Sequence, residues 1–101
     1  VLASIALPRF ADLQEQADVG GAAASAASGA TSYIIEQRSQ GLAVSDCSGI
    51  SSSDLLESSR SGDFAIQNSG CSGGVCAEFT IPTISSAGNF TGEYTCSVVP
   101  N

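Results

Sequence analysis

The chain has 101 residues, of which 43% are hydrophobic, so it can form one small domain with a modest core. Ten acidic residues against three arginines and no lysine give a net charge of −7. This balance argues against nucleic acid as a partner, because phosphate binding depends on clustered cations. The chain contains no histidine, which excludes Cys/His zinc sites and Ser-His-Asp triads, and we expect no enzymatic activity and no cofactor.

Residues 1–40 predict one long helix that begins in an apolar stretch. Residues 1–7 are apolar except for Ser4, and Pro8 and Arg9 follow directly. Side chains then recur at spacings of three, four and seven, the period of one helix face. This predicted face comprises Leu7, Phe10, Leu13, Ala17, Ala24, Ala27, Thr31 and Ile34. The small-residue middle, "GGAAASAASGA", leaves a flexible linker as the alternative, and Gly41 is the expected C-terminal cap.

Residues 41–63 are rich in Ser, Asp and Gly and predict a connecting loop. Within it, "SSSDLLESS" predicts one helical turn capped by Ser53 or Asp54. From residue 64 the pattern alternates in "FAIQ", "VCAEFTI" and "TGEYTCSVV", which predicts three strands in an antiparallel meander, the second closed by Pro82. The fold class is therefore α+β: a single domain, 1–101, with a helix (1–40) packed on one face of a small sheet (64–101).

The four cysteines predict two disulfides and an oxidising, exported location. An all-cysteine zinc site is the alternative, but the only close pair is C-x4-C rather than CxxC. Strand alternation places Cys71 and Cys76 on one outer face beside a hairpin tip, and it turns Cys96 toward the helix and the loop that carries Cys47. Cys71–Cys76 and Cys47–Cys96 are therefore the favoured pairs among three connectivities, with no metal site.

The opening stretch, "LASIALPRFADLQEQA", resembles the part of bacterial type IV pilins where the membrane-buried half of the N-terminal helix passes into its soluble half. In that family an apolar run ends in a pattern like "ILAAIALP", which residues 2–8 match, and Phe10 provides the aromatic residue that follows. The close motif covers about sixteen residues, while the order of helix, loop, sheet and late cysteines covers the whole chain. Two features depart from the pattern: the Gly20-Gly21 pair and four cysteines where many members have two.

The resemblance implies a structural subunit of a type IV pilus, with helices bundled in the filament core and sheets outside. The partners would be copies of the same chain and, before assembly, the inner membrane of a Gram-negative-type bacterium. Seven apolar residues are too few to cross a bilayer, which takes about twenty, so we expect the apolar helix to continue upstream. Pro8 is expected to bend or loosen the helix. The candidate assembly residues are Val1, Leu2, Ile5, Ala6, Leu7, Phe10 and Leu13.

Three other interpretations remain open from the sequence. The apolar stretch could be an ordinary core helix of a free-standing domain. A pseudopilin of a type II secretion system has the same plan and commonly binds calcium, for which Asp46, Asp54, Glu57 and Asp63 offer oxygens at no fixed motif spacing. A minor pilin or adhesive module would use the loop and hairpin tips. The sequon at Asn89 is interpreted as chance.

Overall fold

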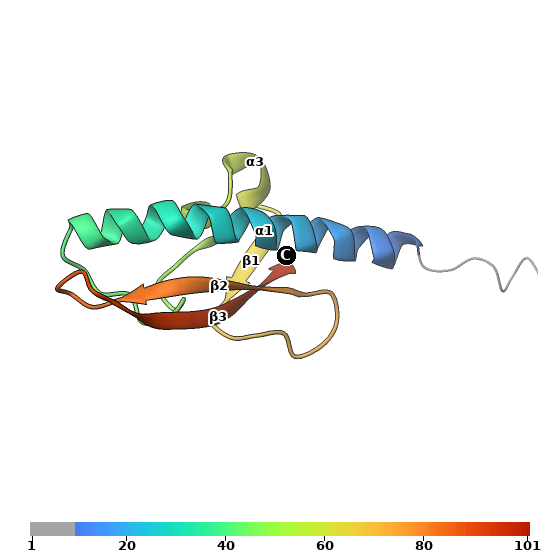
Figure 1. The fold of residues 1–101 in the computed structure, drawn as a ribbon. Coiled ribbons are helices and arrows are strands. Elements are labelled where there is room, and N and C mark those ends of the chain that lie inside the picture. Colours follow the sequence, from blue (N-terminus) through green and yellow to red (C-terminus); the bar gives the residue numbers. More distant parts are fainter. Residues whose placement is uncertain (1–9) are drawn as a thin grey trace, which may run out of the picture.

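The computed structural model describes the backbone of residues 10–101 and the side chains of residues 15–101. It contains one long helix, two short helices and a three-stranded antiparallel sheet, and Figure 1 shows the long helix lying along one face of that sheet. The elements are α1 (Phe10–Ser39), α2 (Ser52–Leu55), α3 (Ser58–Ser61), β1 (Phe64–Gln67), β2 (Ala77–Ile84) and β3 (Phe90–Pro100). The predicted α+β class, with a helix packed on one face of a small antiparallel sheet, is confirmed.

Helix α1 is continuous through the small-residue middle, so the linker alternative is wrong. Its core-facing side chains recur every three or four residues, the spacing at which they share one face. They are Val19, Ala22, Ala23, Ala26, Ala30 and Ile34. Of the predicted face, Ala17, Ala24, Ala27 and Thr31 are exposed, and only Ile34 is buried among the residues with described side chains. Alanine and glycine offer little contrast between faces, so the few larger residues, Val19 and Ile34, determine which face is buried.

The C-terminal end of α1 is closed by a Schellman motif, which confirms the predicted cap at Gly41. Gly41 has a left-handed backbone with φ of 74°, a conformation in which glycine lacks the Cβ penalty. The Gly41 N–H donates to the Arg38 carbonyl at 3.1 Å, and the Leu42 N–H donates to the Gln37 carbonyl at 3.0 Å. These bonds satisfy the last carbonyls and turn the chain back toward the sheet.

Helix α2 crosses α1 at a point where only glycine fits. A Cβ at Gly29 would fall on the Leu55 carbonyl oxygen and within 2.9 Å of its carbonyl carbon. This close approach lets both Leu55 and Leu56 bury their side chains in the core. The short helix is therefore positioned by packing more than by its own propensity.

The predicted caps of this turn are wrong. The N-cap of α2 is Ser51, and Asp54 is the third helical residue, whose carboxylate accepts the Ser51 backbone N–H at 2.9 Å. Ser53 and Asp54 therefore both lie inside the helix. A second short helix, α3, was not predicted. Three consecutive serines before one leucine pair give several cap positions of similar chemistry, and the burial of the leucines decides between them.

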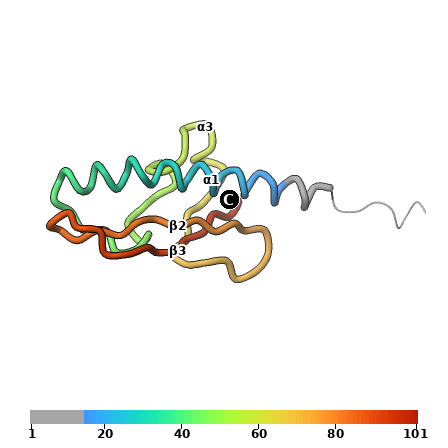
Figure 2. Tube along the Cα trace, viewed as in Figure 1, coloured from blue at the N-terminus to red at the C-terminus, as the bar shows by residue number. Residues whose placement is uncertain are grey.

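The sheet order is β1–β3–β2, so the predicted meander is wrong. β3 has 11 residues and pairs on both sides, with β1 and with β2, both antiparallel. The connection from β1 to β2 crosses beneath the sheet end instead of forming a hairpin (Figure 2). It is held in place by Tyr94, whose hydroxyl donates to the Asn68 carbonyl at 3.1 Å, and by Glu78, whose carboxylate accepts the Cys71 N–H at 2.9 Å.

Strand β2 continues through Pro82 to Ile84, which corrects the prediction that Pro82 ends it. Pro82 lacks an N–H, and this is tolerated because β2 is an edge strand. Along β2, Phe79 and Ile81 are buried while Glu78 and Thr80 are exposed, the alternation of a strand with one buried face.

Both predicted disulfides are confirmed. Cys47–Cys96 joins the segment before α2 to the middle of β3, with a Cα–Cα distance of 6.5 Å, and both residues are buried. Cys71–Cys76 closes the connection between β1 and β2, with a Cα–Cα distance of 5.8 Å. The predicted setting of the second pair is wrong, because no hairpin joins β1 to β2 and Cys76 is buried rather than turned outward.

Candidate functional site

Two of the four carboxylates considered for calcium, Asp46 and Asp54, are engaged separately by their own neighbours. Asp46 accepts hydrogen bonds from the Ser48 hydroxyl at 2.6 Å and from the Ser48 N–H at 2.9 Å, and these bonds lower the pKa of the Asp46 carboxyl. Asp54 is used at the start of α2. Across the part of the chain that the structure describes, no group of three or more His, Cys, Asp or Glu residues is placed to hold a metal ion.

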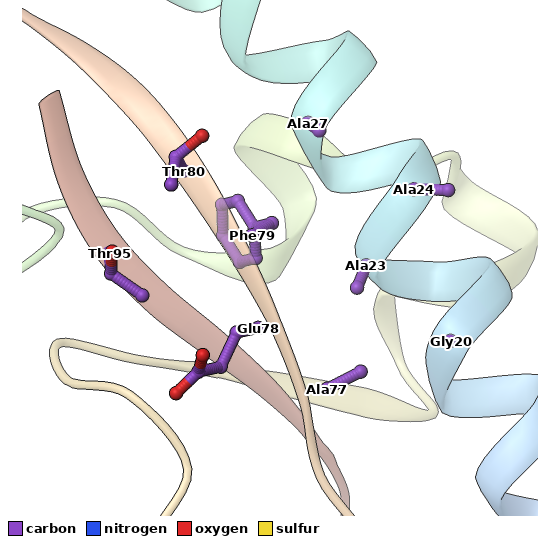
Figure 3. Close-up of a pocket in the computed structure, with 9 residues that line it drawn as sticks. All are labelled: Gly20, Ala23, Ala24, Ala27, Ala77, Glu78, Phe79, Thr80 and Thr95. Atoms are coloured by element: carbon purple, nitrogen blue, oxygen red, sulfur yellow. The ribbon is translucent and has the colours of Figure 1, made fainter.

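A groove of about 550 Å³ runs between α1 and the edge strand β2 (Figure 3). Its walls are mostly small or apolar: Gly20, Ala23, Ala24 and Ala27 from α1, and Ala77 and Phe79 from β2. Figure 3 shows Glu78 and Thr95 on the side of the strands away from α1. With few polar groups to orient a ligand, the groove suits packing against another apolar surface better than specific small-molecule binding.

The β2 edge beside this groove is protected against the addition of another strand. At one end Ile84 exchanges both backbone hydrogen bonds with Val44, at 3.0 and 2.9 Å. Two residues earlier, Pro82 offers no N–H to a partner strand. The rest of the β2 edge, before Pro82, has no partner strand within residues 10–101 and carries the charged side chain of Glu78. These are devices that disfavour strand pairing at a sheet edge, so the groove, rather than the edge, is the accessible feature.

Exposed large apolar side chains lie at and next to the C-terminal end of α1. Within residues 15–101, the large apolar side chains that remain exposed are Ile35 (60%), Leu42 (47%) and Phe90 (63%). The Arg38 guanidinium lies over the Phe90 ring, 5.5 Å from its centroid. A Cβ at Gly88 would come within 3.3 Å of the Arg38 side chain, so the arginine also lies against the β2–β3 turn. We call Ile35, Arg38, Leu42 and Phe90 the tip patch.

Residues 15–18, the first part of α1 whose side chains the structure describes, are exposed and mostly polar. The four residues from Glu15 to Asp18 are exposed, and the first buried residue is Val19. Figure 1 shows α1 continuing here beyond the sheet. The Gln16 side chain donates to the Cys76 carbonyl at 2.9 Å, which ties this turn to the disulfide-closed connection. We call residues 15–18 the acidic turn, because it carries Glu15 and Asp18.

The sequence-predicted assembly residues lie mostly outside what the structure describes. Val1, Leu2, Ile5, Ala6, Leu7 and the predicted bend at Pro8 fall outside the described residues. Phe10 and Leu13 belong to α1, and their side chains are not described.

Sequence reasoning missed the tip patch, although one signal was present. Ile34 and Ile35 are adjacent in a helix that packs on one side, so only one of them can face the core.

No protein-family model matches the sequence, and no curated protein or solved structure is similar enough to count as a match. The topology, a long N-terminal helix on a small antiparallel sheet with disulfides, is pilin-like. None of the helices, over the residues described, is long and apolar enough to cross a bilayer.

Proposed function

We propose that this chain is a structural subunit of a bacterial type IV pilus. The observation that carries the proposal is the order along the chain, in which the pilin-like apolar stretch of the sequence, residues 1–8, is followed by α1, a helix that packs one face on a sheet. An apolar segment of this kind is costly to expose to water, and burying it among copies of itself gives the driving force for assembly.

The small outer face of α1 supports packing between copies. Gly20, Ala24 and Ala27 are exposed, and a Cβ at Gly20 would meet no atom within 4 Å. Residues without bulky side chains let another helix or strand approach closely. The polar side of the domain stays available for solvent, which fits a net charge of −7 on an extracellular filament.

The two disulfides support an exported structural role. All four cysteines are bonded, so no thiol remains to act as a nucleophile or metal ligand. Cross-links of this kind stabilise a small domain outside the cell, where its core is modest and no chaperone repairs it.

Shearing filaments from the native host and reconstructing them by cryo-electron microscopy tests the proposal. We expect density for α1 in the filament core and for the sheet outside, with this chain as a stoichiometric component. A chain that is absent from filaments, in a host whose secretion across the outer membrane fails when the gene is deleted, would instead identify a pseudopilin.

A further inference from the structure

The C-terminal end of α1 and the acidic turn at residues 15–18 differ in charge and in polarity. At the tip patch, the Arg38 guanidinium lies over the exposed Phe90 ring, and Ile35 and Leu42 are exposed three and four positions away from Arg38 along the chain. The acidic turn presents Glu15 and Asp18. In a chain with ten acidic residues and three arginines, an exposed arginine set among apolar side chains is an unusual local environment.

The neighbouring charges leave Arg38 available on its side of the helix. Glu36 is two positions away, which places it roughly 200° around α1 from Arg38. Glu36 instead lies toward Tyr33 and Asp54: burial raises the pKa of the Tyr33 hydroxyl, and Asp54 and then Glu36 raise it further. The other described arginine, Arg60, donates to the Ser25 hydroxyl at 3.1 Å on the side of α1 that faces α3.

Within one molecule the tip patch and the acidic turn cannot meet. Asp18 and Arg38 are twenty residues apart in one helix, a separation of roughly 30 Å. A contact between them therefore joins two copies. Because it uses different surfaces on each copy, it is heterologous, and such contacts generate open helical assemblies instead of closed dimers.

We propose that the tip patch of one subunit docks on the acidic turn of a second copy. This rests on the proposed filament function and names the partner of the exposed end of α1. Arg38 pairs with Glu15 and Asp18 of the second copy, and Phe90 and Ile35 cover the exposed Ala17 of the same turn. Phe90 also holds the guanidinium in place, which lowers the ordering cost of the pairing.

The patch is too small to hold two free subunits together. Stable interfaces bury about 1,200–2,000 Å², far more than four side chains supply. The contact acts where the filament core already brings copies together at high effective concentration. Copies in contact are therefore offset along α1 by roughly 30 Å, the distance between the two surfaces.

Site-specific photo-crosslinking in native filaments tests the proposal. A benzoylphenylalanine replaces Phe90, and a matched control replaces the exposed Ser59 on α3. After illumination, we expect the probe at position 90 to form dimers whose cross-linked peptide contains residues 15–18, and the probe at position 59 to give none with that peptide.

Charge reversal provides the second measurement. Arg38→Glu should reduce the cross-link from position 90 about fivefold, on the scale of an exposed ion pair, and adding Asp18→Arg should restore it. Arg60→Glu makes the same charge change on the other side of α1 and should leave the cross-link unchanged. Circular dichroism of each variant separates loss of docking from loss of folding.

The outcomes separate this contact from the filament function. If filaments contain this chain but the probe at position 90 marks another segment or another protein, the docking proposal is wrong and the proposed function stands. If no filament contains the chain, the proposed function fails and the docking proposal fails with it.

Discussion

The two long sides of α1 have nearly the same composition and opposite roles. On the side facing α2 and α3, Gly29 lies directly beneath the Leu55 backbone, and Ser25 accepts a hydrogen bond from Arg60. On the side facing β2, Gly20, Ala24 and Ala27 border an open groove. Small residues are therefore required on the first side by a contact within the fold. On the second side the fold places no such demand, which leaves that side free for assembly.

The largest expected effect concerns the Cys47–Cys96 disulfide, which anchors the segment before α2 and so the α2 side of α1. Cys47→Ser with Cys96→Ser releases the segment that carries α2 from β3, with a sequence separation of 49 residues. The chain-entropy relation gives a loss of about 4 kcal/mol in the free energy of unfolding. Urea unfolding followed by circular dichroism measures it.

The matched control is Cys71→Ser with Cys76→Ser, with a separation of 5 residues. Its expected loss is about 2 kcal/mol by the same relation. Equal losses for the two pairs would show that loop length does not govern their contribution to stability. The Cys47–Cys96 disulfide would then stabilise the α2 side of α1 less than we argue.

The next effect is at the helix crossing. Gly29→Ala places a methyl group on the Leu55 carbonyl, and the backbone of α2 must shift to make room. Overpacking of this kind costs about 1–3 kcal/mol, which outweighs the gain in helix propensity. We expect a lower midpoint in urea and faster hydrogen exchange in α2. A variant as stable as the parent would mean that α2 is not held against α1.

Gly20→Ala makes the same substitution as Gly29→Ala on the other side of α1, where the helix borders the groove. A Cβ at this position meets nothing within 4 Å, so the substitution should stabilise the fold by about 0.5–1 kcal/mol. Filament yield is the informative readout. A more stable subunit that assembles less well would place a neighbouring copy against Gly20, whereas unchanged assembly would leave this part of the groove open in the filament.

These residues also show how far the sequence leads. The α+β class and the Gly41 cap follow from local chemistry: alternation along strands and a glycine in the left-handed region. Both disulfide pairs were predicted correctly, but the argument for Cys71–Cys76 assumed a hairpin and an outward-facing Cys76 that the fold does not have. The buried face of α1 does not, because Ala23 and Ala24 are equivalent until a sheet is placed beneath one of them. The predicted strand order was wrong for a related reason: no local sequence signal indicates that β3 pairs with both β1 and β2.

Of the two candidate assembly surfaces, one could be recognised from the sequence and the other could not. The apolar stretch was visible as sequence, and its residues 1–8 lie outside what the structure describes. The tip patch was visible only after folding, because Arg38 and Phe90 are separated by about fifty residues and meet through the β2–β3 turn. Contacts between distant segments carry no local signature, so a surface built from them has to be found in the folded chain.

The smallest effect concerns Asp46, which directly precedes the disulfide-bonded Cys47. Hydrogen bonds from the Ser48 side chain and backbone hold the pKa of Asp46 below its ordinary value of 3.8. A carboxyl with a lowered pKa in the folded state stabilises the fold above the unfolded pKa, and this contribution is lost as the pH falls through the folded pKa. The free energy of unfolding therefore depends on this group only below about pH 4, and at neutral pH its stabilising contribution is fully present. Carbon-13 chemical shifts of the Asp46 carboxyl during an acid titration measure the pKa directly. Ser48→Ala removes the hydroxyl donor and should move the pKa upward, toward 3.8, while Ser53→Ala, in α2, should leave it in place. An unchanged pKa in Ser48→Ala would show that the backbone donor alone orders this turn.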